Sequence, residues 1–109
     1  MKIVNVDRDG IYFDNGNRIT CYHFPDCCEY NYADFEQIDD LARQAEFDEN
    51  LIFKSLEGFG FRFGNEDKMF FIPCYSEQNG WYSCDIKIYY NDVEVLNVEC
   101  REVIIWKKY

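Results

Sequence analysis

Apolar and polar residues alternate along most of the chain, and turn residues separate the alternating stretches. A period of two is typical of strands with one buried face. We therefore expect strands over residues 2–6, 11–13, 18–24, 51–58, 59–64, 68–73, 84–90 and 93–106. Within the last range the alternation slips by one residue at Val95 and Leu96. That slip predicts a β-bulge.

Turn signals fix the boundaries of these strands. Asn15-Gly16 lies between two short apolar runs and predicts a tight hairpin, because this dipeptide suits the type I′ turn. Asn91-Asp92 predicts a second turn. Pro73 ends its strand or marks it as an edge, since proline has no N–H to donate to a ladder. The following stretch IPCYSEQNGWYS, residues 72–83, is interpreted as a loop with an unusual number of rings.

One segment has a different period. Residues 26–50 contain nine acids and a single base, Arg43. Within them Phe35, Ile38, Leu41, Ala42 and Ala45 follow helical spacing. We predict one helix of about three turns over residues 34–45, with acids in its first turn where the helix dipole favours them.

Together these elements predict a single domain over residues 1–109. Its class is α+β and β-dominated, with one helix packed on a mostly antiparallel, twisted sheet of six to eight strands. Whether that sheet curls toward a barrel is left open. The core is expected to be aromatic, since the 109 residues include ten Phe, nine Tyr and two Trp.

The net charge of −10 changes the picture of the partners. It argues against direct binding of nucleic acid and of anionic membranes, because both are bound through clustered Lys and Arg. The sequence has no apolar run long enough for a membrane span, and its start does not resemble a signal peptide. We therefore expect a cytoplasmic protein whose six cysteines are reduced, with no disulfide and no cofactor.

The stretch HFPDCCE, residues 23–29, combines the only histidine with two thiols. Such residues suit a zinc site, but no Cys-x₂-Cys pair is present to support one. A nucleophilic Cys27 or Cys28 with His23 as base is a second interpretation, which the surrounding acids oppose. A third interpretation buries one cysteine as a small apolar residue.

The glycines of GFGFRFG, residues 58–64, allow a phosphate-loop interpretation, although the following lysine and helix of such loops are missing. We prefer a structural role, with the phenylalanines on the core face and the glycines where another backbone lies close.

HFPDCCE and the later IPCYSEQNGWYS resemble two motifs, H-x-x-D-C-C-E and IPCYSEQNGYYS, of a family of small proteins from phages, prophages and gut bacteria. Trp81 stands where the family motif has Tyr. The resemblance covers about residues 10–92 and implies a phage or mobile-element origin and a cytoplasmic setting. No activity is assigned to that family, so it supplies no catalytic residues.

We expect the two stretches to form one shallow aromatic patch with an acidic rim, in which Cys28–Cys74 or Cys27–Cys84 supply sulfur surface. The candidate residues are His23, Asp26, Cys27, Cys28, Glu29, Cys74, Tyr75, Ser76, Glu77, Gln78, Asn79, Trp81 and Tyr82.

The predicted function is a non-enzymatic module that binds a protein partner or itself, because tyrosine and tryptophan are favoured as interface anchors. Two alternatives remain. One is a metal-binding protein or cysteine-based enzyme centred on His23, Cys27 and Cys28. The other is an acidic mimic of nucleic acid that inhibits a host DNA-binding enzyme.

Overall fold

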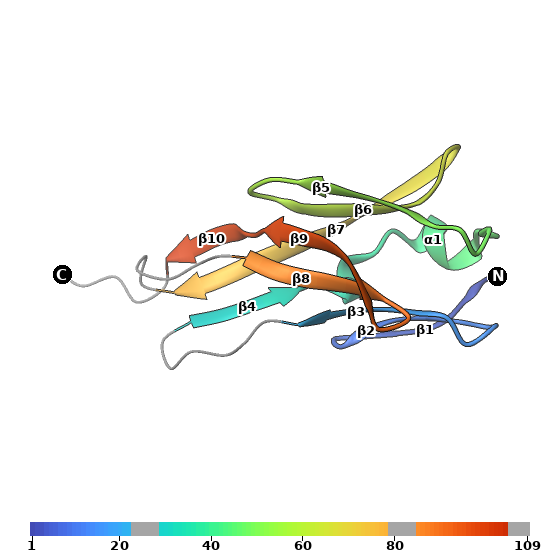
Figure 1. The fold of residues 1–109 in the computed structure, drawn as a ribbon, viewed down its shortest axis with the longest axis horizontal. Helices are drawn as coiled ribbons and strands as arrows, with labels where there is room; N and C mark the ends of the chain where they lie inside the picture. Colours follow the sequence, from blue (N-terminus) through green and yellow to red (C-terminus); the bar gives the residue numbers. More distant parts are fainter. Residues whose placement is uncertain (23–28, 79–84, 105–109) are drawn as a thin grey trace.

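In a computed structural model, the protein folds into two β-sheets and a short helical segment (Figure 1). The structure describes residues 1–22, 29–78 and 85–104. Its strands are β1 (Ile3–Asp7), β2 (Gly10–Phe13), β3 (Arg18–Tyr22), β4 (Glu29–Ala33), β5 (Ile52–Leu56), β6 (Gly60–Asn65), β7 (Lys68–Gln78), β8 (Asp85–Tyr90), β9 (Val93–Glu99) and β10 (Arg101–Ile104). A 3₁₀ turn, η1 (Phe35–Gln37), precedes the helix α1 (Asp40–Gln44).

The first sheet has the order β1-β2-β3-β8-β9, and all of its pairings are antiparallel. The second has the order β10-β7-β6-β5, and β4 also pairs with β7. Among the described residues, its one parallel pairing joins β10 to β7. The β-dominated, mostly antiparallel α+β class is confirmed. The single sheet of six to eight strands is wrong, because the described part of the chain forms ten strands in two sheets that do not close into a barrel.

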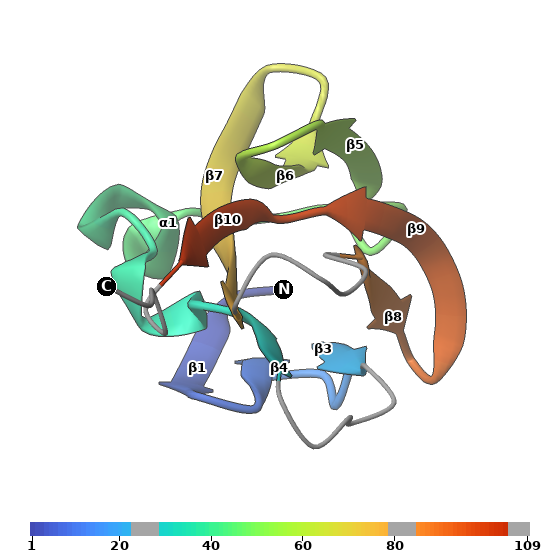
Figure 2. The same cartoon turned by 90° about the vertical axis from the view of Figure 1, so that its left-hand side faces the viewer.

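The core lies between the two sheets, which face each other when the molecule is viewed along its long axis (Figure 2). The first sheet contributes aliphatic residues such as Ile19, Ile86 and Ile88, all buried. The second contributes rings, including the fully buried Phe61 and Phe63. The predicted alternation is borne out at Ile86 and Ile88 of β8 and at Phe61 and Phe63 of β6, which are buried on either side of the exposed Lys87 and Arg62.

The hairpin predicted at Asn15-Gly16 is present and joins β2 to β3. Its turn is not type I′, because Gly16 has a φ of +90° whereas Asn15 is not among the residues with positive φ. Asn91 and Asp92 instead have φ values of +50° and +66°, the pattern of a type I′ turn, between β8 and β9. The predicted bulge is confirmed: Ile88 pairs with Leu96 and Tyr89 with Glu94, so Val95 is the extra residue.

The three-turn helix predicted over residues 34–45 is wrong. Ile38 and Asp39 have extended ψ values of 142° and 136°, which divide the segment into η1 and the five-residue α1. The carboxylate of Asp39 accepts a hydrogen bond from the N–H of Leu41 at 2.9 Å and starts the second piece. Phe35, Ile38 and Ala42 are buried as predicted, but Leu41 is exposed. No helix in the described ranges is long and apolar enough to cross a membrane.

β7 continues through Pro73 to Gln78, so the loop predicted over residues 72–83 is wrong for residues 72–78, and the rest of that range lies outside the described residues. Two glycines of β6 allow this strand to lie close. A Cβ at Gly60 would come within 2.1 Å of the Ile72 carbonyl oxygen, and one at Gly64 within 1.9 Å of that of Lys68. The structural interpretation of GFGFRFG is therefore supported at these glycines and at Phe61 and Phe63, whereas Phe59 is exposed.

Candidate protein-binding site

The chain that follows HFPDCC pairs with the stretch that follows Pro73. β4 runs antiparallel to the second half of β7, with Glu29 opposite Gln78 and Ala33 opposite Cys74. The described ends of the two motifs thus lie side by side. His23, Asp26, Cys27, Cys28, Asn79, Trp81, Tyr82 and Cys84 lie outside the described residues, and Glu29 and Gln78 are described by their backbone alone.

The pleat of β7 divides the predicted patch between two faces. Cys74 and Ser76 point into the protein and are fully buried, so they are core residues rather than surface residues. Tyr75 and Glu77 lie on the opposite, partly exposed face. This division follows from the period of two in a strand, which the loop interpretation of residues 74–77 could not supply.

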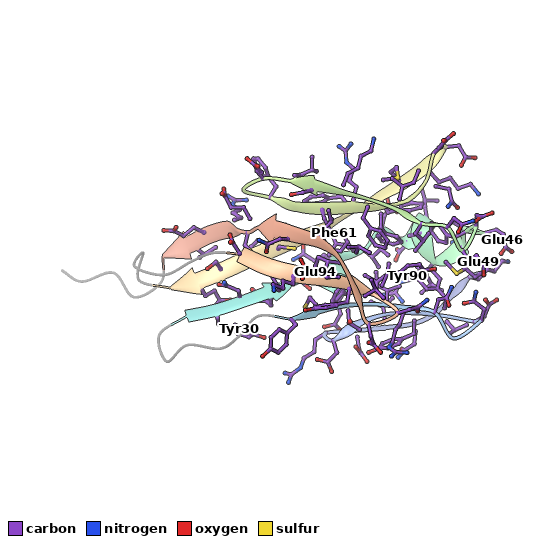
Figure 3. All side chains as sticks on the ribbon, in the orientation of Figure 1. Tyr30, Glu46, Glu49, Phe61, Tyr90 and Glu94 are labelled. Carbon is purple, nitrogen blue, oxygen red and sulfur yellow. The ribbon has the colours of Figure 1, made fainter. Side chains whose placement is uncertain are left out.

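Beside Tyr75 and Glu77, β4 places two further tyrosines on the same face. The register sets Tyr32 opposite Tyr75 and Tyr30 opposite Glu77. We call these four residues the tyrosine face. Tyr30 stacks on Tyr32 with ring centroids 4.8 Å apart, and Tyr32 packs against Tyr75 at 5.7 Å. Tyr30 keeps 55% of its surface exposed, at the end of the molecule away from α1 (Figure 3).

Hydrogen bonds hold the tyrosine face in place. The hydroxyl of Tyr32 donates to Oε2 of Glu77 at 2.8 Å. The pKa of Tyr32 is raised, first by partial burial and then by this bond and the charge of Glu77. At the margin, Nε2 of Gln37 donates to the hydroxyl of Tyr75 at 3.5 Å and to Oδ2 of Asp34 at 2.6 Å.

The third strand of this face is β10. Its parallel pairing sets Arg101 beside Tyr75 and Val103 beside Glu77. Two rows of side chains therefore cross the three strands, one through Tyr32, Tyr75 and Arg101. The other passes through Tyr30, Glu77 and Val103.

Polar groups fasten the buried side of the same strands. The hydroxyl of Ser76 donates to Oδ1 of Asn31, and Nδ2 of Asn31 donates to the carbonyl oxygen of Asp85 at 3.1 Å. These bonds tie β7 to β4, and β4 to the first sheet at β8. The tyrosine face consequently stands on a fixed support, which limits the entropy lost when a partner binds.

The described cysteines do not form the predicted sulfur surface. Cys74 lies in the core near Cys100 and Cys21, and its thiol donates to the carbonyl oxygen of Ile72 at 4.0 Å. The interaction with Cys100 and burial raise the pKa of the Cys74 thiol, and burial raises that of Cys21. Raised thiol pKa values oppose nucleophilic use. Within the described ranges, no group of three or more His, Cys, Asp or Glu side chains is placed to hold a metal ion.

Tyr30 and Tyr32 are absent from the predicted patch because the prediction distinguishes residues 26–50 only by their acids and their helical spacing. The sequence EYNYA, residues 29–33, does alternate rings with small or amide side chains. Tyr30 is exposed and Asn31 and Ala33 are buried, as expected for a strand with one face in the core. The alternation was thus present in the sequence.

Comparison of the chain with known protein families, with curated proteins and with solved structures finds no match in any of the three.

Proposed function

We propose that this protein is a non-enzymatic binding module whose tyrosine face binds a basic segment of a partner protein. The observation that carries the proposal is the stacked pair Tyr30–Tyr32, in which the outer ring is more than half exposed on a rigid sheet. Tyrosines on a fixed support supply contact area at low entropic cost, which is why they serve as interface anchors.

Charge selects the partner. The chain carries −10, and Glu77 lies within the tyrosine face. Arg and Lys side chains are attracted both by such carboxylates and by the faces of aromatic rings. Arg101 at the margin offers one repulsive contact, so the partner's cations are expected on the Tyr30–Glu77 side.

The proposal includes two features that rest on sequence alone. A cytoplasmic setting rests on the sequence, whose start does not resemble a signal peptide. A phage or mobile-element origin rests on the resemblance of the two motifs. Trp81 and its neighbours remain predicted contributors to the same surface.

The test uses a defined probe, the blocked peptide Gly-Arg-Arg-Gly, with Gly-Glu-Glu-Gly as its counterpart. The arginine peptide should shift the ring proton resonances of Tyr30 and Tyr32 in NMR titrations, and the effect should weaken as salt is added. Tyr30→Ala should weaken binding about three- to fivefold, the value of an exposed cation–π contact. Val93→Ala is the matched control, because Val93 is similarly exposed (65%) but lies in the β8–β9 hairpin.

Equal binding of both peptides, or unchanged rings, would contradict the basic-partner proposal. If the protein dimerises as its concentration rises and Tyr30→Ala abolishes this dimer, the partner is a second copy of the chain.

A further inference from the structure

β7 has two halves with different neighbours. Its first half, residues 68–73, pairs with β6 on one side. Its second half pairs with β4 on the side away from β6, and β4 ends at Ala33. The last contact on that side is the N–H of Asp34, which donates to the Pro73 carbonyl oxygen at 2.8 Å. Beyond it the chain turns away into η1, and none of the described strands pairs with this edge of β7 from Met69 to Phe71.

The register shows which backbone groups face that open edge. In antiparallel ladders, hydrogen-bonded pairs alternate with pairs that do not bond each other. The N–H of Cys74 donates to the Phe59 carbonyl oxygen, so the bonded pairs with β6 include Phe61–Ile72 and Phe63–Phe70. Met69 and Phe71 belong to the other set, and their N–H and C=O groups point away from β6. No hydrogen bond from the described residues reaches them.

A groove of about 560 Å³ runs along this edge. It is lined by Gln37, Asp39, Arg62, Met69, Phe70 and Phe71. Gln37 and Asp39 come from η1 and the start of α1, so they form the wall opposite β7. Unpaired backbone groups beside a groove with apolar side chains are the requirements for binding an extended peptide by strand addition.

The side chains of the groove indicate the chemistry of the peptide. Phe71 is 39% exposed on the outer face of the sheet, in the same cross-strand row as Arg62 and Lys54. These two cations are cross-strand neighbours, an unfavourable arrangement, and neither forms an ion pair within the described ranges. Arg62 reaches the groove from β6, and a carboxylate there would relieve the repulsion.

We propose that the groove binds an extended peptide of a partner protein, which pairs with Met69 and Phe71 in line with β4. Its outward side chains include an acid that contacts Arg62, and its inward side chain is apolar and packs beside Phe70. This site shares no residue with the tyrosine face, so each proposal can fail without the other. A second copy of the chain would instead cover this edge in a dimer, which is one of the outcomes that the experiment separates.

The probe is the blocked peptide Thr-Glu-Val-Glu-Thr at millimolar concentration, followed by NMR of backbone amides. In the free protein the amides of Met69 and Phe71 should exchange rapidly, while those of Phe70 and Ile72, bonded to β6, exchange slowly. The peptide should shift the amide resonances of Met69 and Phe71 and protect these amides from hydrogen exchange. Thr-Lys-Val-Lys-Thr should bind at least about tenfold more weakly, and Arg62→Ala should remove most of that difference.

Backbone pairing is tested on both partners. Met69→Pro removes an outward N–H without removing a bond to β6 and should abolish binding, whereas Met69→Leu should retain it. In case the proline variant misfolds, two N-methylated peptides are added to the unchanged protein, each methylated along a different edge of the extended peptide. Only the peptide methylated along the edge that faces β7 should lose binding. The proposal would be overturned if both methylations had equal effects or if Arg62→Ala left binding unaffected. It would also be overturned if the amides of Met69 and Phe71 were already protected in the free protein, or if the protein formed a dimer that covers this edge.

Discussion

Pro73 in β7 and Gly60 in β6 lie directly opposite each other, and any side chain at Gly60 would meet the backbone of β7. The missing N–H of Pro73 costs the β6 ladder nothing, because this pair belongs to the set that does not bond across the strands. On its other side the Pro73 carbonyl oxygen still accepts from Asp34. Because the Pro73–Gly60 pair needs no hydrogen bond across the strands, β7 can pass through a proline in the interior of a sheet.

Gly60→Ala should be strongly destabilising. The new Cβ would lie 2.1 Å from the Ile72 carbonyl oxygen, and φ at this residue is +155°. We expect a loss of at least about 3 kcal/mol, from strained backbone and forced separation of β6 and β7. Urea unfolding followed by circular dichroism measures it. Gly16→Ala is the control, since φ is +90° there but no atom lies within 4 Å, and only about 1 kcal/mol should be lost. Equal losses would show that strand contact at Gly60 is unimportant.

Tyr32→Phe should change how stability depends on pH. The pKa of Tyr32 is raised in the folded protein, so its contribution is fully present below the unfolded pKa of about 10. It is lost as the pH rises toward the folded pKa, because the unfolded chain ionises first. Above pH 10, the free energy of unfolding of the wild-type protein should therefore fall by up to about 1.4 kcal/mol per pH unit more than that of Tyr32→Phe. Parallel curves of unfolding free energy against pH would contradict the assignment.

The buried thiols should be chemically protected. Cys74 and Cys100 are 0% and 2% exposed, and the interaction with Cys100 together with burial raises the pKa of Cys74. A thiol reagent at pH 8 should modify them only after the protein unfolds, when all six cysteines of the chain should titrate as free thiols without reduction. Mass spectrometry of the digested protein identifies the modified positions. Rapid labelling of Cys74 in the native state, or fewer than six thiols after unfolding, would refute this prediction.

Tyr90 should stabilise the end of the molecule that carries the N-terminus. Its hydroxyl donates to the Glu49 carbonyl oxygen at 2.7 Å and accepts from Nδ2 of Asn17 at 2.9 Å. Figure 3 places Tyr90 in the same half of the molecule as Glu46 and Glu49. Tyr90→Phe should cost about 1–2 kcal/mol in thermal or urea unfolding, because two partners lose a bond.

Its neighbour Tyr89 provides the matched control, since no hydrogen bond of its hydroxyl is found within the described ranges. Tyr89→Phe should change stability by less than about 0.5 kcal/mol. Similar losses in the two variants would mean that the ring, and not the hydroxyl, matters at position 90.

Short-range patterns predicted much of this fold. The alternation through Ile86 and Ile88 predicted β8 and its buried face, and the slip at Val95 predicted the bulge. These features depend on neighbouring residues. The helix failed because the burial of Phe35, Ile38 and Ala42 is satisfied equally by two short pieces, and the spacing does not reveal the extended backbone at Asp39.

The site was harder to predict because it depends on strand pairing across a long sequence separation. Tyr32 and Tyr75 face each other only because β4 pairs with β7. The continuation of β7 past Pro73 likewise depends on partners that lie elsewhere in the chain. Once that continuation is known, the buried and exposed faces of Cys74 to Glu77 follow from the pleat alone.

The parallel pairing of β10 with β7 has a consequence for the growing polypeptide. β10 is made after all the other described strands, yet it covers one edge of β7 at residues 75–78. Until the ribosome has released β10, that edge carries unpaired backbone groups beside aromatic residues, which is the kind of surface that recruits foreign strands. Nascent chains stalled before residue 101 should therefore be the species most in need of chaperones.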